Sequence, residues 1–368
     1  ILATSNGVCI GVDGVAVSPW KPFIGAEKAV VVDAKGQKHD VMYLLGADEI
    51  YDMAKFKVSG KTSAAPLATT VSAGEELWIA PMAKSGSPLK ASASSVETFM
   101  GKYHYTILNS PATDKLNGAP VCNAKGQVIG LFSLSGSLQS ATDAGYARSF
   151  VLKGLSQNDA TLRQSVIRIG LPDTAEEAVV ALMLSSEKPE SVHEAVVKDF
   201  MEKFPQANDG YYAWANRMIA KGDIAEADKT LQTAIGKVTA KDEAFYNYAR
   251  LIYQNALNPS LEAKTKSVGW TLDKALEVIR KAQEVRPVDA YRHLQAQIVF
   301  AKGDFAKAYA EFEALTKTKF NNPELYLEMA QSRQHLGASD QEILDLLNKS
   351  IELCDTPYVS TSAPYFYM

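Results

Sequence analysis

The sequence has few cysteines and no recognisable ligand motif. Its three cysteines, Cys9, Cys122 and Cys354, lie far apart, and no Cys-x-x-Cys pair or Cys/His cluster occurs, which argues against a structural zinc site. Cys9 and Cys122 lie in apolar runs and are predicted to be buried free thiols, with a disulfide as the alternative. Gly-rich phosphate loops and metal-ligand spacings are lacking as well, so neither a cofactor nor a metal is predicted.

Long apolar runs and an excess of one charge are also missing. No stretch reaches the roughly 18 apolar residues of a transmembrane helix. The formal net charge of the 368-residue chain is -4, and no dense Lys/Arg run occurs, so a nucleic-acid partner is not expected. The sequence begins at Ile1 rather than Met. This start permits a secretory signal peptide upstream that is removed on export, with a cytoplasmic location as the alternative.

The sequence changes its period near residue 155. Seven short strands are predicted before that point, at residues 8–10, 15–17, 29–33, 41–45, 76–80, 104–108 and 127–133, and their close spacing is typical of a barrel or sandwich. From about Thr174, apolar residues recur at intervals of three and four, which predicts helices. The predicted organisation is a β domain over 1–155, a linker over 156–173 and a helical domain over 174–368.

The helical half repeats itself. Glycines break the helical pattern at Gly222, Gly303 and Gly337. The last two lie 34 residues apart, whereas the first two lie 81 apart, which is two periods of 34 with 13 extra residues assigned to 255–267. Glycine permits a sharp turn between two helices, and one helical hairpin cannot bury its apolar face alone. A degenerate first repeat is expected around Lys188, and residues 357–368 are read as the beginning of a further first helix.

These features resemble the tetratricopeptide repeat (TPR) family. The resemblance implies an α-helical TPR solenoid whose concave face, or the insertion at 255–267, binds a protein or peptide ligand. Polar residues on the first helices are candidates for that role, and their alternative role is to form solvated helix faces. The candidates are Arg217, Asn247, Arg250 and Arg292.

Three segments of the β half resemble trypsin-like (chymotrypsin-fold) serine proteases, in the expected order. They run from Gly7 to Lys21 (GVCIGVDGVAVSPWK), from Ala47 to Ala54 (ADEIYDMA), and from Asn117 to Val121 (NGAPV), followed by 123–130. The resemblance implies a double β-barrel; another small barrel or a sandwich is the alternative. It places Asp52 at the catalytic aspartate, but Lys21 at the histidine and Asn117 at the nucleophilic serine.

Acyl transfer needs a hydroxyl or thiol nucleophile with a base in reach, and neither Asn117 nor Lys21 supplies these groups. We therefore predict a pseudoprotease: a non-catalytic scaffold that binds protein or peptide through the TPR array and through the strand carrying Leu131, Ser133 and Ser135. The alternative is an active peptidase in which His39 or His104 serves a nearby serine. A third possibility is a subunit of a larger envelope complex. The combined architecture resembles bacterial envelope proteins that join a trypsin-like domain to TPRs. This resemblance implies export to the bacterial periplasm or cell envelope after removal of a signal peptide.

Overall fold

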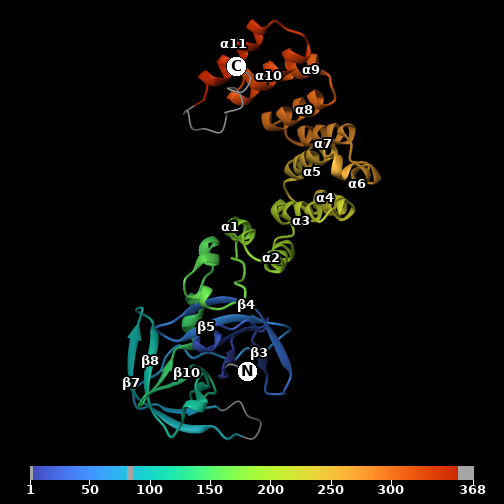
Figure 1. Ribbon diagram of the computed structural model, residues 1–368. Coiled ribbons are helices and arrows are strands. Elements are labelled where there is room, and N and C mark those ends of the chain that lie inside the picture. Colours follow the sequence, from blue (N-terminus) through green and yellow to red (C-terminus); the bar gives the residue numbers. More distant parts are fainter. Residues whose placement is uncertain (1–2, 81–85, 355–368) are drawn as a thin grey trace. The chain divides into compact units, whose positions relative to one another are not determined.

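The computed structural model describes residues 3–80 and 86–354 (Figure 1). The chain divides into two compact units, Ile1–Val196 and Val197–Met368. The described strands all lie in the first unit, and a run of helices follows them. The predicted multidomain β-then-α organisation is therefore confirmed. Among the described helices, none combines the length and the apolar content that crossing a bilayer would require.

The first unit begins with a five-stranded antiparallel sheet. Its order is β1-β2-β5-β4-β3. The strands are β1 (Val8–Cys9), β2 (Val15–Ser18), β3 (Val30–Val32), β4 (Lys38–Asp48) and β5 (Met53–Val58). Trp20, Leu44 and Phe56 are buried in its core. Aromatic and aliphatic side chains on one face of these strands supply the hydrophobic driving force for this sheet.

A closed six-stranded barrel follows, in the order β10-β11-β8-β7-β6-β9. Its strands are β6 (Glu76–Ile79), β7 (Leu89–Phe99), β8 (Tyr103–Asn109), β9 (Pro120–Cys122), β10 (Val128–Ser135) and β11 (Leu138–Thr142). Leu77, Ile79 and Phe132 fill its core. Each of the seven predicted strands has a counterpart in the two sheets. Strands β5, β7, β9 and β11 were not predicted from the sequence. In β7, the run Lys-Ala-Ser-Ala-Ser-Ser lacks the branched and aromatic residues that indicate a strand.

Residues 156–173, which were predicted as a linker, pack on the first sheet. They include the end of the 3₁₀ helix η4 (Gly154–Asn158) and the whole of η5 (Leu162–Gln164). Leu162 and Ile167 belong to the core of that sheet, and Ile169 forms a parallel bridge with Leu44. Burial of these apolar side chains attaches the segment to the strands.

Helices α1 (Ala175–Ser185) and α2 (Glu190–Lys203) precede the helical pairs of the second unit. The pairs are α3 (Asn208–Ala220) with α4 (Ile224–Lys237), α5 (Lys241–Ala256) with α7 (Leu272–Val285), α8 (Asp289–Ala301) with α9 (Phe305–Thr316), and α10 (Pro323–His335) with α11 (Asp340–Glu352) (Figure 1). The predicted turn glycines Gly222, Gly303 and Gly337 have φ of 75°, 85° and 73°, the left-handed region that glycine adopts without strain. Residues 357–368, read as a further helix, lie outside the described residues.

Small side chains set the close approach of the paired helices. Ala227 on α4 and Ala308 on α9 are fully buried, which lets the helix axes come together. Ala225 and Ala306, two residues earlier on the same helices, are exposed. Two residues along an α-helix turn the side chain by about 200°, so the two alanines of each pair lie on opposite faces.

The extra residues between α5 and α7 form η6 (Pro259–Leu261) and α6 (Glu262–Ser267). Lys264 Nζ donates to the carbonyl of Gly222 at 2.8 Å. Trp270, only 1% exposed, donates its indole N–H to Asp228 Oδ1 at 2.7 Å, and the Tyr248 hydroxyl donates to the same oxygen. Trp270 therefore fixes the end of the insertion to the helical core, whereas most of α6 is exposed.

We expect Trp270→Ala to lower the free energy of unfolding of the helical unit by about 3–5 kcal/mol, because a large buried side chain leaves a cavity. Trp270→Phe keeps most of the packing and loses the Asp228 bond, at a cost of about 1–2 kcal/mol. Urea unfolding followed by far-UV circular dichroism measures both. Leu336→Ala, at a residue 44% exposed, is the control, and equal effects of Trp270→Ala and the control would contradict the packing described.

Candidate functional site

The structure brings together two of the three predicted triad positions. Asp52 lies in the turn between β4 and β5, with a φ of 47°. Its Oδ1 accepts the backbone N–H groups of Trp20 and Lys21, both at 2.9 Å, and its Oδ2 lies 3.8 Å from Lys21 Nζ. The Lys21 side chain is 76% exposed, so this ion pair contributes little. The two backbone bonds are what holds the end of β2 to the β4–β5 turn.

Asn117, at the third position, is held on several sides. Its N–H donates to Asp114 O at 2.9 Å, closing the 3₁₀ turn η2 (Asp114–Leu116), and its carbonyl accepts from the Asn6 N–H at 3.0 Å. The Asn6 side-chain amide also donates to this carbonyl, at 3.0 Å. Asn117 Oδ1 accepts the Leu134 N–H at 2.7 Å. Sequence reasoning missed Asn6, because it lies more than a hundred positions away and matches no motif.

Gly118 packs this turn against the segment that leads to Lys21. Its φ is 81°, and an added Cβ would lie 2.2 Å from Asn6 O and 2.6 Å from Pro19 Cδ. Asn117 is thus adjacent to the Lys21 segment. Among the contacts of the described residues, however, Lys21 and Asn117 do not touch each other.

The predicted peptide-binding strand is β10. Leu131 is buried, Ser133 half-buried and Ser135 exposed. All three pair with β11 along one edge. On the other edge of β10, the Phe132 N–H donates to Ala119 O at 2.9 Å. The next N–H on this edge, that of Leu134, donates to the Asn117 side chain. An added strand at this edge would have to displace the Asn117 side chain.

Neither histidine of the alternative mechanism contacts a serine hydroxyl among the described residues. His39 Nδ1 lies 2.9 Å from the carbonyl oxygen of Ser59, and its Nε2 lies 3.5 Å from Asp33 Oδ2. His104 Nε2 lies 2.8 Å from the carbonyl oxygen of Thr69. Backbone carbonyls therefore orient both rings.

One Ser–His pair that the sequence did not indicate lies between α1 and α2. Ser185 Oγ is 2.8 Å from His193 Nδ1 and donates to Leu182 O at 2.6 Å. Its single proton is thus committed to the carbonyl, so Ser185 accepts from His193, and the serine is fully buried. Burial lowers the pKa of His193. The pair does not present an activated nucleophile.

The cysteines offer no better nucleophile. Cys9, Cys122 and Cys354 are free thiols, each half-buried rather than fully buried. Burial raises the pKa of Cys9 and that of Cys122. Because the thiolate is the reactive form, a raised pKa disfavours attack at neutral pH.

In the helical unit, Arg250 is the most distinctive of the candidate peptide-binding residues. Its guanidinium lies 4.9 Å from the ring centre of Tyr212 and 5.4 Å from that of Tyr246. Its Nε is buried without a hydrogen-bond partner, and no carboxylate in the described part of the chain pairs with it. The other candidates differ: Arg292 is exposed and pairs with Asp289 at 3.3 Å, while Arg217 and Asn247 are half-buried.

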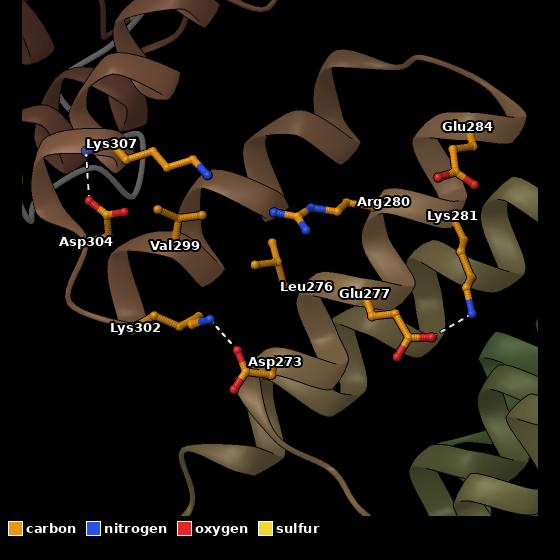
Figure 2. Close-up of a pocket in the computed structure, with 10 residues that line it drawn as sticks. All are labelled: Asp273, Leu276, Glu277, Arg280, Lys281, Glu284, Val299, Lys302, Asp304 and Lys307. Carbon is orange, nitrogen blue, oxygen red and sulfur yellow. Dashed lines mark hydrogen bonds and ion pairs between the residues drawn. The ribbon is translucent and has the colours of Figure 1, made fainter.

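A groove of about 510 Å³ lies along α7, α8 and α9 (Figure 2). Leu276 and Val299 contribute apolar surface, and charged residues of both signs surround them. Lys302 pairs with Asp273, and Figure 2 shows the Arg280 guanidinium directed toward Val299, with Leu276 beside it. Mixed charge gives this groove no preference for one sign of ligand.

No family model and no curated protein matches this chain. Among solved structures, it is similar to one described as an HtrA-type protease AlgW with decapeptide, with 16% sequence identity and a TM-score of 0.34. The alignment covers 39% of this chain and 48% of that one, about half of its length. A likeness of this size does not define a fold, so the architecture rests on the strand pairing described above.

The packing around Asn117 predicts a large effect of Gly118→Ala. We expect a loss of unfolding free energy of about 2–4 kcal/mol, because the new Cβ combines a positive φ with a backbone clash. Gly126→Ala is the matched control, since Gly126 has a φ of 72° and open space around its Cβ, so its cost is about 1 kcal/mol. Thermal unfolding followed by circular dichroism compares the two variants. Equal destabilisation would show that the close contact with Asn6 and Pro19 is not needed.

Proposed function

We propose that this chain is a non-catalytic scaffold for a protein or peptide ligand, built from a degenerate trypsin-like domain and a TPR array. The observation that carries the proposal is the bond from the Leu134 N–H to Asn117 Oδ1 at 2.7 Å. At the position of the nucleophile, the side chain is a structural acceptor. A carboxamide used in this way neither attacks a carbonyl nor receives activation from a base.

The remaining groups of the site support the same proposal. The exposed Lys21 carries an ammonium beside Asp52 and has no lone pair to accept a proton. The Asn117 N–H, which corresponds to an oxyanion donor in active relatives of the trypsin-like family, is bonded to Asp114 O. The nucleophile and the base are therefore replaced by Asn117 and Lys21, and the corresponding oxyanion donor is bonded within the protein. The Asp52 bonds to Trp20 and Lys21 favour the trypsin-like interpretation, since they join the first two matched segments.

Ligand binding is assigned to the helical unit. The Arg250 guanidinium contacts the rings of Tyr212 and Tyr246 and has no carboxylate partner among the described residues, so these contacts restrict its orientation before a ligand binds. Its bond to a ligand carboxylate would be charge-assisted. The rival function, a peptidase with an unorthodox site, would need His39 or His104 to leave its carbonyl partner. An envelope location and membership of a larger complex stay predictions that rest on the family resemblance.

We expect no covalent labelling of the protein by a broad fluorophosphonate probe, as measured by intact mass with trypsin as positive control. Labelling would overturn the non-catalytic assignment, and mapping the modified serine would identify the nucleophile. The double variant Lys21→His/Asn117→Ser separates two causes of inactivity. Labelling of this variant alone would assign the inactivity to the two replaced groups, whereas no labelling would assign it to the closed turn at residues 114–118.

Arg250→Ala is expected to weaken binding of anionic peptides by about 10- to 100-fold, the effect of losing one charged hydrogen bond. The probe is a pool of fluorescent decapeptides ending in Asp or Glu with a free carboxylate, titrated by anisotropy. Lys229→Ala, which removes one exposed positive charge from α4, is the control for net charge. Unchanged binding by Arg250→Ala, or an equal loss in both variants, would remove Arg250 from the ligand site.

A further inference from the structure

Three side chains of the helical unit bring metal-ligating atoms together. His293 on α8 and Glu324 and Glu328 on α10 each offer one atom, and these atoms all lie within 4.8 Å of one another. His293 Nε2 is 2.6 Å from Glu328 Oε2. The two glutamates are four residues apart on one helix, so they share the face turned toward His293. This cluster is separate from the groove along α7–α9 and from the Arg250 site.

Neighbouring side chains hold two of these ligands in place. The His293 ring packs near Phe312 and Phe320, with ring centres 6.0 and 5.4 Å away. Glu328 Oε1 accepts from Gln297 Nε2 at 2.7 Å, which leaves Oε2 directed at the imidazole. Outer hydrogen bonds of this kind orient the ligands of metal sites.

The charges of the cluster do not balance. One imidazole faces two carboxylates, so the cluster carries at least one excess negative charge when both glutamates are ionised. Glu324 is exposed, and its carboxylate forms no ion pair or hydrogen bond among the described residues. In contrast, Glu328 is largely buried, with a side chain 13% exposed. A divalent cation would compensate both carboxylates in a way that one protonated histidine does not.

We propose that His293, Glu324 and Glu328 form a site for one first-row transition-metal dication of the zinc type, which joins α8 to α10. His293 would bind through Nε2 and each glutamate through one carboxylate oxygen, with water at the fourth position. Such bonds are about 2.0–2.2 Å long. On binding, the proton on Nε2 leaves to solvent and the metal takes its place between His293 and Glu328. The imidazole favours zinc over calcium or magnesium, which prefer all-oxygen ligands.

The test is isothermal titration of the chelator-treated full chain with Zn²⁺, together with Co²⁺ absorption spectra. We expect one ion per chain and a Co²⁺ spectrum of nitrogen and oxygen ligation without thiolate charge-transfer bands. Glu324→Gln should weaken binding by about 10-fold or more, and Gln297→Ala by about 10-fold. Glu324 is exposed and unpaired, so its variant tests the site without disturbing the fold; His293→Gln should abolish binding.

His335→Gln is the matched control, because His335 lies on α10 but stacks on Phe305 and does not belong to the cluster. Three results would overturn the proposal. They are no Zn²⁺ binding, thiolate bands in the Co²⁺ spectrum, and equal Zn²⁺ binding by wild type and the Glu324→Gln and His293→Gln variants. Binding that these variants leave unchanged would identify an adventitious ion only. The peptide titration of the Arg250 variant does not depend on this outcome, so failure of the metal site and failure of the proposed function are distinguishable.

Discussion

The Asp52 carboxylate organises the part of the first unit in which the candidate site lies. By accepting the N–H groups of Trp20 and Lys21, it fixes the chain as it leaves β2 and lets Trp20 enter the core, where it is 1% exposed. An unpaired N–H near this core would cost about 1–3 kcal/mol. Because the segment is fixed here, Pro19 is in place to support the turn at Gly118. In this molecule the carboxylate has a structural task that needs no proton transfer.

The same use of polar groups recurs at Asn117. In a hydrolase, the nucleophile and the oxyanion donor must be free to meet a substrate. Here the Asn117 backbone N–H closes its own turn at Asp114, and its two oxygens connect that turn to Asn6 and Leu134, which are distant in sequence. Bonds of this kind stabilise the turn that leads into β9. Structural bonding of this kind is what the proposed non-catalytic function requires.

In the helical unit, some polar groups are hydrogen-bonded inside the core and others form no ion pair. Asp228 accepts hydrogen bonds from Tyr248 and Trp270 inside the core, so this network stabilises the packing of the helices. Arg250 and Glu324, in contrast, form no ion pair among the described residues, although Glu324 lies within 4.8 Å of His293. Since a charge held in a fixed place without a partner favours a ligand of opposite sign, the first site suits a carboxylate and the second a cation.

The sequence by itself determined the β-then-α order, seven strands and the helix-turn glycines, because alternation, helical period and positive φ are local properties of the chain. It did not indicate β7, whose small polar residues become a strand only through pairing with β6 and β8. It also predicted no metal ligands, since His293 and Glu328 stand 35 positions apart with no motif between them. Only the tertiary arrangement of α8 and α10, which both pack on α9, brings these two side chains to 2.6 Å from each other. Tertiary structure decided such sites because the distances between side chains on different elements depend on how the elements pack.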